Sequence, residues 1–193
     1  GGFGGGGRND GWYGDDIRTA REYPTNNRSG GAPDWDNPVD FEHDVFTFAR
    51  IRYDTGGSGR GRGGWQTDLP DSDLNFSFRL QQMTSLKVDP DGRILSLLDP
   101  ELLDFPFIYI VEPGRLWFSP EESVRLRDYL LNGGFLMMDD FWGESAWANV
   151  ARVFKDVFPE RNFVELPMDH PLYRAVFEIK EKGQVPNVNT GHN

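Results

Sequence analysis

The chain has 193 residues, a formal net charge of −11 at pH 7 and no cysteine. That length suits one domain with an appended segment, and the acidic balance argues against a nucleic-acid partner, because phosphate neutralisation needs clustered Lys and Arg. The missing cysteine excludes disulfides, thiolate metal sites and thiol nucleophiles, and no apolar run approaches the roughly 20 residues of a transmembrane segment.

Residues 1–40 are rich in glycine, proline and isolated aromatic residues, without helical or strand periodicity. We predict an irregular arm here, followed by one α/β domain over residues 41–193. Aromatic side chains spaced along the arm can act as anchors; they are Phe3, Trp12, Tyr13, Tyr23 and Trp35. Docking on a protein partner or on another copy in a homo-oligomer is one expectation, and a clasp on the arm's own domain is the alternative.

The first half of the domain contains two predicted strands and one predicted helix. The pattern indicates a strand over 45–53, a surface loop over the glycine run at 56–64, and a helix over 73–84 capped by Asp73. A short strand is expected over 93–98. The glycine run resembles a phosphate loop only superficially, because no helix opens on its last glycine.

The second half alternates strands and helices. A continuous apolar run predicts a doubly buried strand over 107–111, and Ser119-Pro120-Glu121-Glu122 predicts a capped helix over 120–132. A strand at 134–138 and a helix from Ala146 to Val157 follow. We also expect a strand at 162–166 and a short helix at 171–177. This alternation predicts a parallel sheet in which 107–111 and 134–138 are neighbours joined by the helix.

Polar residues follow three of the predicted strands, where ligands are expected in open α/β sheets. They are Asp54, Glu112, Asp139, Asp140 and the aromatic Trp142. Such carboxylates can hold Mg²⁺ or Ca²⁺, with Asp139 and Asp140 as the metal candidates, or can act as a general acid and a general base. An aromatic ring beside them would suit a sugar. The alternative is that one aspartate caps the next helix and Trp142 fills the core.

Three further residues are candidates for the same site. His170 precedes a predicted helix and can serve as a base, although a histidine there more often fixes its own loop by a local hydrogen bond. Trp65 and Asp68 can form a lid over the strand ends. Turn chemistry alone also explains their residue types.

Several short motifs are spread along the domain. They are Trp65-Gln66-Thr67-Asp68-Leu69-Pro70, Asn75-Phe76, Arg79-Leu80, Phe105-Pro106-Phe107-Ile108-Tyr109, Glu112-Pro113-Gly114, the segment 133–143 and Asp169-His170-Pro171-Leu172. As a set, over residues 45–188, they resemble the bacterial family called domain of unknown function 4159. That family is similar to the class I glutamine amidotransferase-like superfamily, which implies a flavodoxin-like three-layer sandwich. Its members tend to be exported or envelope-associated, so the resemblance implies a periplasmic or envelope location.

The glutaminase of that superfamily depends on a cysteine nucleophile at a strand-to-helix elbow, so a cysteine-dependent glutaminase is not expected from this chain. The resemblance also implies that the family domain continues beyond Asn193 with at least one more strand. In that case an edge of the sheet is missing here, or the chain is part of a longer protein.

Three functions remain open from the sequence. The first is a non-catalytic binding or assembly module of the cell envelope, which requires no cofactor. The second is a hydrolase-like enzyme that uses Asp139 and Asp140 with help from Glu112 or His170, with or without Mg²⁺ or Ca²⁺. The third is a carbohydrate-binding module that uses Trp142 and Trp65. A fold alone does not decide between them.

Overall fold

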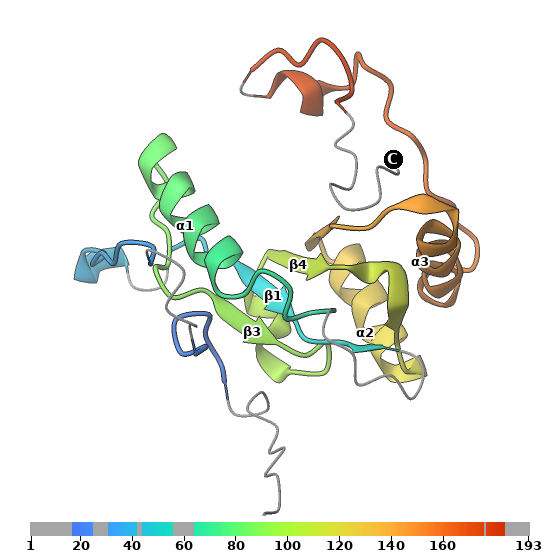
Figure 1. The fold of residues 1–193 in the computed structure, drawn as a ribbon, viewed down its shortest axis with the longest axis horizontal. Coiled ribbons are helices and arrows are strands. Elements are labelled where there is room, and N and C mark those ends of the chain that lie inside the picture. The colour runs from blue at the N-terminus through green and yellow to red at the C-terminus, as the bar shows by residue number, and fades with distance from the viewer. Residues whose placement is uncertain (1–16, 25–30, 42–43, 56–63, 176, 184–193) are drawn as a thin grey trace, which may run out of the picture.

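The computed structural model describes residues 17–24, 31–41, 44–55, 64–175 and 177–183. Its centre is a parallel sheet of four strands in the order β3-β1-β4-β6 (Figure 1). The strands are β1 (Ala49–Ile51), β3 (Arg93–Leu95), β4 (Phe107–Val111) and β6 (Phe135–Asp139). Helices flank this sheet, so the fold is an α/β three-layer sandwich of the flavodoxin-like kind.

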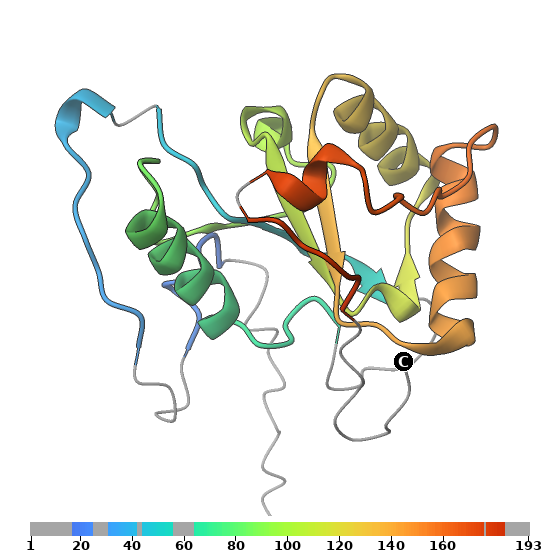
Figure 2. The ribbon, with the colours of Figure 1, turned by 90° about the horizontal axis from the view of Figure 1, so that it is seen from above.

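The helices lie on both faces of the sheet. One face carries α1 (Asp71–Met83), and the other carries α2 (Pro120–Leu131) and α3 (Gly143–Val157), as Figures 1 and 2 show. Short 3₁₀ turns join these elements; they are η1 (Val39–Phe41), η2 (Pro100–Asp104), η3 (Pro113–Arg115) and η4 (Pro171–Arg174). A separate antiparallel pair consists of β2 (Asp54–Thr55) and β5 (Leu116–Trp117).

Alternating side chains of the strands supply two cores. On β4, Ile108 and Ile110 face the larger core under α2 and α3, whereas Tyr109 and Val111 belong to a smaller cluster on the α1 face. Both sets are buried, which explains why this strand is a continuous apolar run in the sequence. The α1 face is covered unevenly: on β6, Phe135 is 56% exposed.

The strand order places a switch point at the centre of the sheet. From β1, the chain first adds β3 on one side and then β4 on the other. In open α/β sheets, ligands bind beyond the carboxyl ends of the strands at such a reversal. A ligand site is therefore expected next to the residues that follow β1 and β4.

Most of the predicted elements are confirmed. The strand at 107–111 has the predicted bounds, α2 starts on the predicted capping box, and β4 and β6 are parallel neighbours. The prediction that Asp73 caps α1 is wrong, because α1 begins at Asp71 and the Asp73 carboxylate is committed to Arg50. The strand predicted at 162–166 is also wrong: this stretch is irregular.

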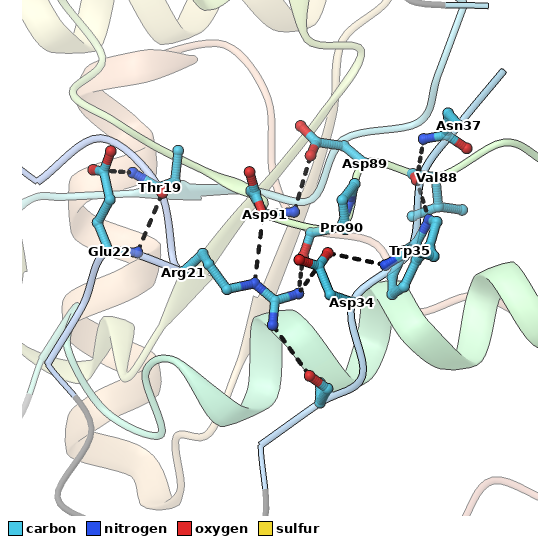
Figure 3. A network of polar contacts seen from close by, with 11 residues as sticks. Thr19, Arg21, Glu22, Asp34, Trp35, Asn37, Val88, Asp89, Pro90 and Asp91 are labelled. Atoms are coloured by element: carbon cyan, nitrogen blue, oxygen red, sulfur yellow. Dashed lines mark hydrogen bonds and ion pairs between the residues drawn. The ribbon is translucent and has the colours of Figure 1, made fainter. Parts of the chain in front are cut away.

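The described part of the arm is held by its own domain (Figure 3). Arg21 donates to the carbonyl of Pro90 at 2.8 Å, and the indole of Trp35 donates to the carbonyl of Val88 at 2.9 Å. Ile94 of the edge strand β3 donates to the carbonyl of Arg18 at 2.8 Å. These residues thus follow the intramolecular alternative. Three of the expected anchors, Phe3, Trp12 and Tyr13, lie outside the described residues.

None of the helices in the described ranges is long and apolar enough to cross a bilayer.

Candidate functional site

Three carboxylate residues in the described part of the chain adopt left-handed backbone conformations. They are Asp68 with φ 57°, Glu112 with φ 48° and Asp140 with φ 63°, and no other described residue except glycine has a positive φ. Each such conformation costs about 1–3 kcal/mol and persists only where the surrounding structure imposes it. They come from three separate loops: the one before α1, the end of β4 and the end of β6. We call these three residues and Asp139 the acidic cluster.

Glu112 occupies the turn between β4 and η3 and is fixed from several directions. Its Oε2 accepts the N–H of Gly64 at 2.8 Å, and its own N–H donates to the carbonyl of Asp139 at 3.0 Å. The hydroxyl of Tyr53 lies 2.8 Å from the Glu112 carbonyl. Burial, and then the charge of Glu112, raise the pKa of Tyr53, so this phenol remains a neutral donor.

Asp139 is the last residue of β6, whereas Asp140 follows the strand with a left-handed backbone, so the two carboxylates have different surroundings. The Oδ1 of Asp139 accepts the N–H of Asp140 at 2.8 Å. The pKa of Asp140 is raised by burial first, and then by the charges of Glu112, Asp68 and Asp139. The other three carboxylates of the acidic cluster therefore all disfavour the negative charge of Asp140.

Tyr109 lies under this cluster on the α1 face of β4. It is only 7% exposed, and the guanidinium of Arg50 lies 5.1 Å from the centre of its ring. Burial and the charges of Asp139, Asp73 and Asp140 raise its pKa, against the opposing effect of Arg50. No hydrogen bond joins its hydroxyl to any described residue, so a nearly buried donor is left available beside the carboxylates.

Arg50, in the middle of β1, holds the loop that carries Asp68. It is fully buried, and one terminal nitrogen donates to the carbonyls of Trp65 at 2.7 Å and Thr67 at 3.0 Å. The other terminal nitrogen donates to Oγ of Ser72 at 2.7 Å. Sequence reasoning missed Arg50. The available signal was a single arginine inside the apolar run Phe46–Ile51, since a buried charge requires partners.

The other sequence candidates lie elsewhere. Trp65 packs against the larger core, so its ring is not a lid, and Asp54 is an exposed residue of β2 opposite Trp117. Trp142 directly precedes α3 and is half-buried. His170 accepts the N–H of Leu172 through Nδ1 at 3.2 Å, which is the local role that the sequence favoured.

The acidic cluster has the chemistry of a receptor for positive charge. None of its four carboxylates forms an ion pair with a described residue. The described residues also contain no group of three or more histidine, aspartate or glutamate side chains placed to hold a metal ion.

Two comparisons with known proteins bear on this site. The model of a family described as domain of unknown function, DUF4159, matches residues 47–193. These residues include all four strands of the parallel sheet and all four members of the acidic cluster. A search of curated proteins finds no match for the chain.

Proposed function

The chain belongs to the DUF4159 family, and from that premise we propose that it is a non-catalytic binding domain whose acidic cluster receives a cationic organic ligand. The observation that carries the proposal is the convergence of Asp68, Glu112 and Asp140 from three loops, each with a strained backbone, at the switch point of the sheet. Strain of this kind is costly for a purely structural role.

Electrostatics supports a cation as the ligand. Burial first, and then the charges of Glu112, Asp68 and Asp139, raise the pKa of Asp140, which disfavours its negative charge. A bound ammonium group would offset this repulsion and donate charge-assisted hydrogen bonds to the carboxylate oxygens. The hydroxyl of Tyr109 supplies a neutral hydrogen-bonding group beside them. An organic ligand with more than one donor can contact carboxylates from more than one of the three loops.

Thermal unfolding at constant ionic strength tests this proposal. We expect 1,5-diaminopentane to raise the Tm of the wild type, while the uncharged 1,5-pentanediol does not. A ligand at 100 times its Kd stabilises by about 2.7 kcal/mol, which is readily measured. Asp140→Asn and Glu112→Gln should abolish the shift, whereas Asp104→Asn, an exposed aspartate of η2, should retain it.

The same experiment includes MgCl₂ and CaCl₂ as separate titrants. A rise in Tm with either metal and none with the diamine would show that the ligand is a hard cation and not an organic one. An equal shift with the diol would contradict recognition of charge. No shift with any titrant, in a wild type that unfolds cooperatively, would remove the acidic cluster as a binding site.

The absence of catalysis is supported by the residue at the strand-to-helix turn. In enzymes with a nucleophile elbow, a strained residue directly after a strand presents the nucleophile. Here the two strained residues that directly follow a strand are carboxylates instead of a cysteine or serine: Glu112 after β4 and Asp140 after β6. We propose on this basis that the domain is a non-glutaminase relative of the class I glutamine amidotransferase-like superfamily.

One observation favours a hydrolase-like enzyme as the second candidate. Two adjacent carboxyl groups, of which one has a raised pKa, can divide the roles of general acid and general base. Asp140 would be the acid and Glu112 the base. A panel of p-nitrophenyl esters and glycosides tests this: turnover that is lost in both Asp140→Asn and Glu112→Gln would establish it. No turnover by the wild type would leave binding as the function.

The proposal also includes an envelope location, as the family resemblance implies, and a protein partner or second copy that residues 1–40 contact through their aromatic side chains. Fractionation of cells that express the full-length protein from its own gene tests the location. Recovery with cytosolic markers would contradict it. Light scattering of the purified chain tests self-association.

A further inference from the structure

A second candidate site lies on α3, away from the acidic cluster. A cavity of about 370 Å³ opens between the outer face of this helix and the chain that follows it. This volume is in the range of pockets that hold small organic ligands. Figures 1 and 2 both show α3 at the periphery of the fold, on the far side of the sheet from α1 and β3. The acidic cluster does not contribute to this cavity.

Aromatic rings form most of the cavity wall. Trp147, Ala151 and Phe154 lie on one face of α3, at the spacing of successive helical turns. Phe163 returns to the same place, and its ring centre lies 5.0 Å from that of Trp147 and 5.1 Å from that of Phe154. Trp147 and Phe163 remain 46% and 43% exposed, so much apolar ring surface faces water.

The returning chain is anchored, so the cavity is formed without a ligand. The Nζ of Lys155 donates to the carbonyls of Pro159 at 3.3 Å and Arg161 at 2.8 Å. The guanidinium of Arg161 lies 5.1 Å from the ring centre of Phe158. A preformed site avoids the cost of ordering a loop when a ligand binds.

The cavity is lined by two positively charged residues. Lys155 and Arg161 both line it, and neither forms an ion pair with a carboxylate in the ranges that the structure describes. Glu160, next to Arg161 in the sequence, is bound to Arg127 at 2.8 Å, and Asp156, next to Lys155, lies 4.0 Å from Arg152. Lys155 and Arg161 thus present positive charge at the cavity. A negatively charged ligand would complement them.

We propose that this cavity binds a small planar aromatic carboxylate. The ring of the ligand packs on Trp147, Phe154 and Phe163, while its carboxylate meets Arg161 and the remaining donor of Lys155. The site is independent of the acidic cluster, and it has the opposite charge preference. Each of the two sites therefore serves as a control for the charge preference of the other.

Isothermal titration with three naphthalene compounds tests the proposal. We expect naphthalene-2-carboxylate to bind, neutral naphthalene-2-methanol to bind more weakly, and 2-naphthylmethylammonium to bind most weakly at this site. Arg161→Gln should weaken the carboxylate at least roughly tenfold, because a charge-assisted hydrogen bond is lost, and should leave the alcohol almost unchanged.

Two substitutions on α3 supply a matched pair. Ala151→Trp fills the cavity and should abolish binding, whereas Ala148→Trp, at an exposed position of the same helix that does not line the cavity, should not. Equal affinity for the three compounds would overturn the proposal, as would unchanged carboxylate binding in Arg161→Gln. No binding of naphthalene-2-carboxylate to the folded wild type would also overturn it. The Arg161→Gln result decides the matter even if Ala151→Trp fails to fold.

Discussion

Arg50 of β1 and Asp73 of α1 form an ion pair in which both side chains are fully buried. Nε of Arg50 lies 2.9 and 3.1 Å from the two carboxylate oxygens of Asp73. The remaining donors of the guanidinium hold the loop before α1 through the carbonyls of Trp65 and Thr67. One arginine thus connects the central strand, the helix on its face and the loop that carries Asp68.

We predict that breaking this pair is strongly destabilising. Arg50→Met leaves the Asp73 charge buried without a cationic partner, and such a change costs about 3–5 kcal/mol in the free energy of unfolding. The double variant Arg50→Met, Asp73→Leu should recover part of the loss, but not the loop contacts. Urea unfolding measures both. Asp156→Asn, which breaks an exposed pair with Arg152 at 4.0 Å, should cost less than about 1 kcal/mol. Similar losses of unfolding free energy in Arg50→Met and Asp156→Asn would contradict the prediction.

The elements that the sequence predicts well are those with local signals. Ser119 and Glu122 form the capping box of α2 in the structure, and the apolar run at 107–111 becomes β4 with the same bounds. The strand predicted over 162–166 is absent, because short apolar alternation is equally compatible with an exposed irregular chain. In the structure Val164 is 80% exposed. No strand of the sheet pairs with it there.

The candidate site was only partly predictable. Glu112, Asp139 and Asp140 could be placed at one sheet edge, because the carboxyl ends of parallel strands share that edge. From the sequence, Asp68 could be placed only as part of a lid over the strand ends. Its position depends on a loop that folds around Arg50. The roles of Arg50 and Tyr109 depend on contacts between distant parts of the chain, and periodicity does not report such contacts.

Gly134 should tolerate no side chain. A Cβ atom at this position would lie 2.2 Å from the ring of Tyr129. The ring cannot easily move, because its hydroxyl donates toward the carbonyls of Phe105 at 2.9 Å and Phe135 at 3.3 Å. We expect Gly134→Ala to cost about 1–3 kcal/mol through overpacking. Gly183→Ala, with no atom within 4 Å of the new Cβ, should change stability by less than about 0.5 kcal/mol. Equal Tm values for the two variants would refute this packing.

Asp140 should make stability depend on pH in a predictable direction. Its pKa in the folded protein is raised above the ordinary value of 3.8, so the fold binds the proton more tightly than the unfolded chain does. The resulting stabilisation is fully present below the unfolded pKa and is lost as the pH rises through the folded pKa. Asp140→Asn should therefore gain stability over the wild type at pH 7, with little difference at pH 3. Urea unfolding across this range measures it, with Asp104→Asn as control. A constant difference at all pH values would contradict the repulsion.

The docked part of the arm should stabilise the domain from within the same chain. The indole of Trp35 bonds the carbonyl of Val88, and its ring centre lies 6.0 Å from that of Phe78 on α1. Because Trp35 is half-buried, Trp35→Ala should cost less than a core tryptophan does, about 1–2 kcal/mol. Trp117→Ala, at a ring 42% exposed on β5, should cost less.

Removal of residues 1–38 extends this prediction to the whole arm. We expect a lower Tm for the truncated chain and an unchanged oligomeric state in light scattering, since the described arm contacts are all within one chain. A truncated chain that keeps its Tm but loses a dimer would show that the arm acts between copies, and would transfer the stabilising role of Arg21 and Trp35 to an interface. The two readouts, Tm and mass, therefore separate a clasp from an assembly contact.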